Sequence, residues 1–196
     1  MYQIYKNSRD KAWEALIRCK IDSLPVNLML IAKHYNIKVI KYSESKYVQE
    51  LNIPDTDGFS LYKPILRKHI IYYNDNVQNN GRIRFTIAHE LGHCLLGHNT
   101  KGHTNYRNSE IDNKEDPNET AANIFARDLL MPATVLHSLN MSSPEQIAEI
   151  CNVSLQSAEI RFKRLTELNK RGMYNKHPLE RQVYSQFKDY IDSNKQ

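Results

Sequence analysis

Two histidines and a glutamate stand at a spacing that suits metal-dependent hydrolysis. The sequence contains His89-Glu90-Leu91-Gly92-His93, an H-E-x-x-H pattern. Four residues are a little more than one helical turn, so on a helix both imidazoles project from one face, roughly 6 Å apart at Cβ, and can bind one ion. Imidazole nitrogen is a good zinc ligand, and catalytic zinc sites use three protein ligands and leave a fourth position for water. The pattern therefore predicts a zinc site at His89 and His93.

The glutamate of the pattern is placed to move protons. Glu90 directly follows the first histidine, so on a helix it is rotated by about 100° and lies beside the ion. From there its carboxylate can accept a proton from the attacking water and deliver it to the leaving amine. Zinc would acidify that water and polarise the scissile carbonyl. This division of labour predicts a zinc peptidase with Glu90 as the catalytic base; the alternative is a solvated helix face that carries these side chains by chance.

A third metal ligand must come from another segment. Asp116-Pro117-Asn118-Glu119 predicts the start of a helix that runs to Leu130, and Glu119 is the leading ligand candidate. Glu119 also fits the third position of a capping box, where it would bond the backbone amide of Asp116. Spacing alone does not decide between ligand and cap. The competing ligands are imidazole or acidic side chains of the same region: His98, His103, Asp112 and Glu115.

The elements that must position these residues can be placed from hydrophobic periodicity. A helix is expected from about Arg82 to Leu96, where Gly97 can end it in the left-handed conformation. Upstream of it, three short apolar or β-branched segments predict strands, and two amphipathic stretches predict helices. The strands are expected at 37–42, 58–61 and 69–73, and the helices at 8–20 and 25–35. The fold class is therefore α+β, with a small sheet packed on the helix that carries the H-E-x-x-H pattern and a mostly helical C-terminal half.

The C-terminal half contains a segment that resembles a helix-turn-helix. Residues 98–115 are polar without apolar period and are expected to border the site. Downstream, 144–165 reads as helix, short turn and second helix, with three apolar residues expected between the helices: Ala148, Val153 and Ile160. Three basic residues can contact phosphates: Arg161, Lys163 and Arg164. Because few other basic residues accompany them, packing or protein docking is favoured over DNA binding.

Composition is typical of an ordinary globular protein. The 196 residues are 40% hydrophobic and 25% charged, with a net charge of +5 that falls short of a dedicated nucleic-acid binder. The three cysteines are odd in number and scattered, which argues against both a disulfide framework and a cysteine-based zinc site. No apolar run is long enough to cross a bilayer and the N-terminus has no signal-peptide core, so a cytoplasmic protein without membrane contact is expected.

The motifs together resemble one known family. The segments R-F-T-I-A-H-E-L-G-H-C-L-L at 84–96, E-T-A-A-N-I-F-A at 119–126 and L-L-M-P at 129–132 are similar to those of the ImmA/IrrE metallo-endopeptidases, and the resemblance spans roughly 23–165. It implies that Glu119 is the third zinc ligand beside His89 and His93, and that Asn123 either supports a ligand or packs, with packing favoured. It also implies cleavage of a helix-turn-helix transcriptional repressor of a phage, mobile element or stress regulon.

The expected domain organisation follows from these assignments. A zincin-like catalytic domain is expected at 1–140, a helix-turn-helix-like segment packed on it at 141–172, and a polar C-terminal tail with helical potential at 173–196. The alternative function is a non-proteolytic, zinc-containing binding partner of a transcriptional regulator, of antitoxin or toxin type, or a DNA-binding regulator. Such a binder would have no need of the water-activating Glu90, and duplex binding that weakens with salt would indicate the regulator.

Overall fold

The strands form one four-stranded sheet in the order β1-β3-β2-β4. Their bounds are β1 (Lys38–Lys41), β2 (Gly58–Lys63), β3 (Lys68–Tyr73) and β4 (Asn105–Arg107). Strand β1 is parallel to β3, whereas β2 is antiparallel to both of its neighbours, β3 and β4. The computed structural model describes residues 2–50, 56–99, 105–107 and 116–195, and for 105–107 it describes the backbone alone.

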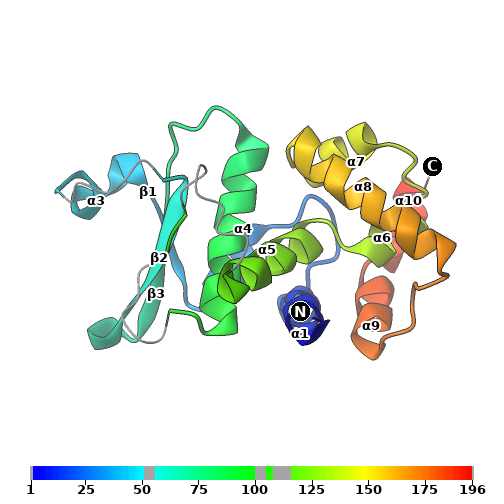
Figure 1. Cartoon of the computed structure of the whole chain (residues 1–196), viewed down its shortest axis with the longest axis horizontal. Helices are drawn as coiled ribbons and strands as arrows, with labels where there is room; N and C mark the ends of the chain where they lie inside the picture. Colours follow the sequence, from blue (N-terminus) through cyan, green and yellow to red (C-terminus); the bar gives the residue numbers. More distant parts are fainter. Residues whose placement is uncertain (1, 51–55, 100–104, 108–115, 196) are drawn as a thin grey trace.

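Helices make up most of the rest of the described chain. They are α1 (Tyr2–Arg18), α2 (Leu28–His34), α3 (Lys46–Glu50), α4 (Asn80–Leu96), α5 (Pro117–Leu130), α6 (Ala133–Ser138), α7 (Pro144–Cys151), α8 (Leu155–Lys170), α9 (Pro178–Gln186) and α10 (Lys188–Asn194), with 3-10 turns at Tyr42–Glu44 and Pro64–Leu66. Figure 1 shows the sheet at the left, α4 beside it, α5 and α1 between α4 and the C-terminal helices, and α6 to α10 at the right. The fold is therefore α+β, as the sequence predicts. Among the described residues, none of the helices combines the length and apolar character that crossing a bilayer requires.

The two faces of the sheet have different neighbours. One face carries a small apolar cluster formed by Phe59, Leu61, Ile70 and Tyr72. Because side chains alternate along a strand, the residues between them in β2 point to the other face, towards α4. There Gly58 lies so close to the helix that a Cβ on it would stand 2.6 Å from Cγ2 of Thr86, and Ser60 contacts Glu90. A small residue at 58 thus allows the sheet to reach the helix.

A second close approach brings α5 against α4. A Cβ on Gly92 would lie 3.1 Å from the Phe125 ring and 3.2 Å from Cα of Ala122, tighter than most ordinary contacts. Phe125 and Ala122 are fully buried, so neither can move into solvent to make room. The glycine inside H-E-x-x-H is therefore a packing residue that lets the two helices touch.

The C-terminal helices are packed on the same core. A Cβ on Gly81, at the start of α4, would collide with the backbone of Val153 and Ser154 in the turn between α7 and α8. On α8 itself, Arg161 is fully buried and its Nη2 lies 2.9 Å from Oδ1 of Asp128 on α5. The helix pair is thus held against α4 and α5 by a close backbone contact and a buried ion pair.

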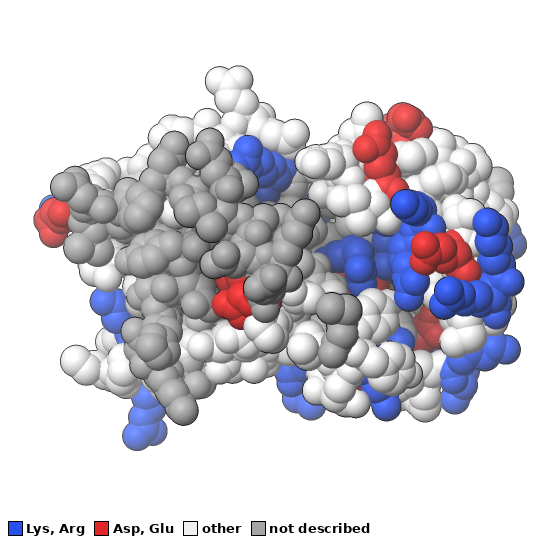
Figure 2. All heavy atoms as spheres, viewed as in Figure 1, with Lys and Arg blue, Asp and Glu red and all other residues white. Residues whose placement is uncertain are grey.

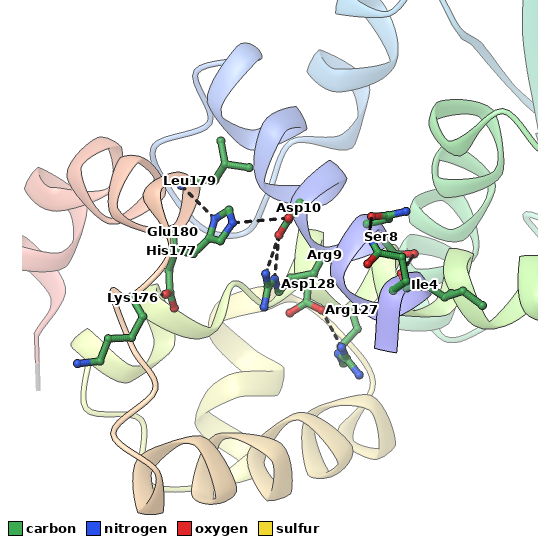
Figure 3. A network of polar contacts seen from close by, with 12 residues as sticks. Ile4, Ser8, Arg9, Asp10, Arg127, Asp128, Lys176, His177, Leu179 and Glu180 are labelled. Atoms are coloured by element: carbon green, nitrogen blue, oxygen red, sulfur yellow. Dashed lines mark hydrogen bonds and ion pairs between the residues drawn. The ribbon is translucent and has the colours of Figure 1, made fainter. Parts of the chain in front are cut away.

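A polar contact also connects α1 to the start of α9, close to an ion pair within α5 (Figure 3). The guanidinium of Arg9 donates to Asp10, whose other oxygen lies 3.7 Å from Nε2 of His177 just before α9. Asp128 accepts from Arg127 on the same helix at 2.7 Å. These contacts extend the core, which includes Val183 of α9, into the C-terminal segment.

Several sequence expectations need correction. The first helix begins at Tyr2 rather than Ser8, and the second begins at Leu28 after an Asn27 cap rather than at Pro25. Ile160 was expected between the two helices of the pair, but 61% of it is exposed. Arg161 was a candidate phosphate contact, yet it is the buried partner of Asp128 and cannot reach a nucleic acid. Arg161 is buried because its guanidinium pairs with Asp128 of α5, a contact that periodicity alone does not locate.

Candidate metal centre

Helix α4 places the two histidines of the H-E-x-x-H pattern side by side in the interior. The helix begins at the Asn79 cap, whose side chain accepts from the amide of Arg82, and ends at Gly97 with a φ of 80°. His89 and His93 are 1% and 0% exposed, and their Nε2 atoms lie 2.9 Å apart. The alternative of a solvated helix face is excluded, because both rings are enclosed between the sheet and α5.

Helix α5 brings the third residue to the same point. Asp116 caps this helix by accepting from the amide of Asn118 at 2.8 Å, with Pro117 in the first turn. Both carboxylate oxygens of Glu119 face the imidazoles: Oε2 lies 3.1 Å from Nε2 of His89 and Oε1 lies 3.1 Å from Nε2 of His93. Of the two roles open to Glu119, the structure therefore places it at the histidines rather than at the helix cap. Within the described residues, His89, His93 and Glu119 form the group suited to hold a metal ion.

The Nδ1 atoms of both imidazole rings also have hydrogen-bond partners. Nδ1 of His89 lies 2.9 Å from Oδ1 of Asn123, and Nδ1 of His93 lies 3.0 Å from Nδ1 of His98. Packing is the favoured expectation for Asn123, but its side chain contacts His89. His98, one of the competing ligands, is partly buried against His93. Histidines that bind a metal usually have such a partner on the other nitrogen, which fixes the ring and its tautomer.

The chemistry of this group calls for a cation. An amide oxygen only accepts, so His89 donates from Nδ1 to Asn123 and its neutral ring turns a lone pair at Nε2 inward. If His93 likewise donates to His98, two lone pairs and a carboxylate face one another at 2.9 to 3.1 Å. Such an arrangement is repulsive unless a proton or a metal ion lies among them. Tetrahedral zinc with bonds near 2.0–2.1 Å would separate its ligand atoms by roughly 3.3 Å, close to these distances.

The pKa shifts have the same origin. Burial lowers the pKa of His93, but the hydrogen bond that His93 donates to Glu119 and the nearby carboxylates outweigh burial, and the net pKa is raised above 6.5. Burial raises the pKa of Glu119, but the two imidazoles more than offset this and hold the pKa well below its ordinary value. The pocket therefore favours a positive charge among these three side chains.

Glu90 is enclosed beside the histidines. It is fully buried, and its Oε2 accepts from Oγ of Ser60 on β2 at 2.5 Å. Ser60 in turn accepts from Nδ2 of Asn99, just past the end of α4, at 2.6 Å. Oε1 of Glu90 is buried without a hydrogen-bond partner among the described residues. An orphaned carboxylate oxygen of this kind fits a group that accepts from a transient donor such as water.

The sequence did not point to Ser60 or Asn99. The available signal for Ser60 was weak: a small polar residue between the apolar Phe59 and Leu61 of a strand. The other competing ligands, His103, Asp112 and Glu115, lie outside the described residues. The Tyr72 ring stacks on Phe59 with 5.0 Å between ring centroids and so belongs to the apolar cluster of the sheet.

The sequence that builds this site also matches the model of a known protein family. The M78 peptidase model, described as the IrrE N-terminal-like domain, matches residues 32–163, which include the sheet, α4, α5 and most of the helix pair. This chain belongs to the M78 peptidase family. No curated protein matches the chain. The family supports a metallopeptidase-like function, and the resemblance to ImmA/IrrE peptidases is thereby confirmed.

In this M78 peptidase, the partner of His89 gives a direct prediction. Asn123→Ala should weaken zinc binding by about 10- to 100-fold, because the His89 ring loses the acceptor that fixes its tautomer and orientation. Competition with a chelator of known zinc affinity measures the change. Asn118→Ala, an exposed position on the same helix, is the matched control and should bind zinc like the native protein. Equal affinity of all three proteins would show that Asn123 only packs.

Proposed function

We propose that this chain is a zinc-dependent metallo-endopeptidase in which His89, His93 and Glu119 hold the ion and Glu90 is the catalytic base. The observation that carries the proposal is the convergence of two buried imidazole nitrogens and one carboxylate from a different helix, with contacts of 2.9 to 3.1 Å. Two histidines and one glutamate are a ligand set of zinc peptidases. The buried Glu90 beside them supplies the acid-base group that the reaction needs.

The residues of this chain suggest a division of roles during peptide hydrolysis. Bound zinc would acidify a water and polarise the scissile carbonyl. Oε1 of Glu90 is available to take the proton of the attacking water, since Oε2 is engaged by Ser60. The same carboxyl then delivers the proton to the leaving amine, which restores Glu90. Asn123 and His98 keep the imidazole rings in place throughout.

The substrate we propose is a cytoplasmic helix-turn-helix repressor of a phage, mobile element or stress regulon. A peptidase acts on proteins, and the membership in the M78 family supports that level of description. The repressor itself is inferred from the resemblance to ImmA/IrrE peptidases in the motifs around His89 and Glu119. Cleavage of the repressor would derepress its genes.

The same proposal includes a division of labour along the chain. Residues 1–140 would form the catalytic part, 141–172 a helix pair that docks on it, and 173–196 a helical tail. The buried contact of Arg161 with Asp128 supports packing of the pair on the catalytic part. It also argues against DNA binding by α8, as does Figure 2, in which acidic residues lie among the Lys and Arg side chains over the C-terminal helices.

The competing proposal is a zinc-containing protein that binds a regulator without cutting it. A pure binder has no use for a buried carboxylate with an unpartnered oxygen, because burying such a group costs stability. Glu90 therefore favours catalysis.

Co-expression with a helix-turn-helix repressor, chosen from any that are encoded next to this gene, tests the proposal. The native protein should convert the repressor into two fragments, detected by mass spectrometry, and a chelator should prevent this in a lysate. Stable capture of the intact repressor by zinc-loaded protein would instead support the non-proteolytic binder. Neither cleavage nor binding would remove the repressor as the proposed substrate.

A further inference from the structure

A chain of two hydrogen bonds leads from the end of α4 across the sheet to the buried glutamate. Nδ2 of Asn99 donates to Oγ of Ser60 at 2.6 Å, and Oγ of Ser60 donates to Oε2 of Glu90 at 2.5 Å. All three side chains are fully buried, with exposures of 0%. Ser60 is 30 positions from Glu90 and 39 positions from Asn99 in the sequence, so both contacts exist only in the assembled fold.

The direction of the chain is determined by its chemistry. A serine hydroxyl has a single proton and can accept at the same time. Because Asn99 offers Ser60 an amide N–H, the hydroxyl oxygen is the acceptor on that side and its proton points to the carboxylate. Asn99 therefore commits the serine proton to Glu90, and the hydrogen bond to a charged acceptor is of the stronger, shorter kind.

The thiol next to this hydrogen-bond chain carries no charge. The thiol of Cys94 on α4 adjoins Ser60 and Asn99, and burial raises its pKa so that it remains neutral. On the other side, β2 is held against α4 by the close contact at Gly58, two residues before Ser60. The hydroxyl is thus fixed by the backbone of a central strand rather than by a flexible loop.

We propose that Ser60 and Asn99 are positioning residues that hold one oxygen of Glu90 and thereby aim the other, Oε1, at the attacking water. The inference rests on the proposed role of Glu90 as the base and extends it to two residues outside the motif. A carboxylate is free to rotate about its last bond unless one oxygen is held. Fixing Oε2 removes that freedom before the substrate arrives, which is the preorganisation that acid-base catalysis gains from its supporting residues.

Kinetics of designed variants provide the first test. With the purified neighbouring repressor as the probe, Ser60→Ala should lower kcat by roughly 10- to 100-fold with little change in KM and with full zinc content. Ser60→Thr, which keeps the hydroxyl, should recover most of kcat. Asn99→Leu removes the amide that donates to Ser60 and should also lower kcat. The double variant should be no slower than Ser60→Ala, because both substitutions break the same chain.

The matched control is a buried serine away from the site. Ser8 is 1% exposed and donates to the carbonyl of Ile4 within α1 (Figure 3), so Ser8→Ala removes a comparable hydroxyl without touching Glu90. It should leave kcat unchanged. A kcat of Ser60→Ala within about twofold of native, or no recovery in Ser60→Thr, would overturn the proposal.

An infrared measurement separates this inference from the proposed function. The difference spectrum between native protein and Glu90→Gln isolates the carboxylate stretch of Glu90, and loss of the Ser60 hydrogen bond should shift that band in Ser60→Ala and Asn99→Leu but not in Ser8→Ala. A shifted band in a protein that cleaves nothing would keep the hydrogen-bond chain and reject the peptidase. An unshifted band in a protein that cleaves with dependence on Glu90 would reject the chain and keep the peptidase.

Discussion

Glu90→Gln is expected to lower the rate of repressor cleavage by roughly 10²- to 10⁴-fold, the range that a general base contributes. The amide cannot accept the proton of the attacking water, and it cannot deliver a proton to the leaving amine. Because glutamine has the same shape as glutamate, it fits the cavity between β2 and α4, where Ser60 can still bond its carbonyl oxygen. The zinc ligands are untouched, so zinc content should equal that of the native protein.

Purified native and variant proteins, each with measured zinc content, are compared in single-turnover cleavage. Glu149→Gln is the matched control, since Glu149 is an exposed residue of α7, and it should cleave at the native rate. Equal rates for the native protein and Glu90→Gln would refute Glu90 as the base. Loss of zinc from Glu90→Gln would show instead that Glu90 supports the metal.

Asp128→Asn is expected to lower the free energy of unfolding by roughly 3–5 kcal/mol, the cost of leaving a buried charge without its partner. Arg161 is 0% exposed, and Asp128 joins it to Arg127 with contacts of 2.9 and 2.7 Å. Removing the carboxylate charge leaves two guanidinium groups near each other in the interior, where no described carboxylate replaces it. The melting temperature should fall by about 10 °C for a chain of this size.

Denaturant unfolding and thermal scans measure this change. Asp192→Asn is the control: it breaks the exposed pair with Lys188 on α10 and should barely change the midpoint. A change in unfolding free energy below about 1 kcal/mol in Asp128→Asn would contradict the structural role of the ion pair.

The stability gap between native protein and Asp128→Asn should also depend on pH. Burial raises the pKa of Asp128, but Arg127 and Arg161 outweigh it and hold the pKa below its ordinary 3.8. A depressed pKa in the folded state means that the stabilisation is fully present above the pKa of the unfolded chain. This stabilisation is lost as the pH falls below about 3.8 towards the pKa of the folded state. The difference in unfolding free energy between the two proteins should therefore narrow only in acid.

Local signals in the sequence located several elements well. Helix α5 runs from Pro117 to Leu130 as predicted, because Asp116 and Pro117 start a helix and Pro132 stops it. The left-handed Gly97 ends α4 where it was expected. By contrast, α1 begins six residues early, at Tyr2 rather than Ser8, because the polar run at 6–11 separates its first turn from the apolar stripe that starts at Ala12.

The site residues also differ in how well local sequence signals locate them. His89, Glu90 and His93 belong to one helical turn, so their spacing was sufficient to place them together. The role of Glu119 could be assigned only from the family resemblance or from the folded structure, because its spacing fits a helix cap as well. Ser60 and Asn99 meet Glu90 only after the sheet packs on α4, and no local pattern encodes that contact. The contact of His98 with His93 has no local signal either, because it forms only when the turn after Gly97 folds back onto the His93 ring.

The zinc content of the purified protein tests the central claim most directly. Elemental analysis after exhaustive dialysis should find about one zinc per chain in the native protein and in Glu90→Gln, and a strongly reduced content in Glu119→Ala and His93→Ala. A native protein that contains no zinc and does not take it up, or full retention in both ligand variants, would contradict a metal held by His89, His93 and Glu119.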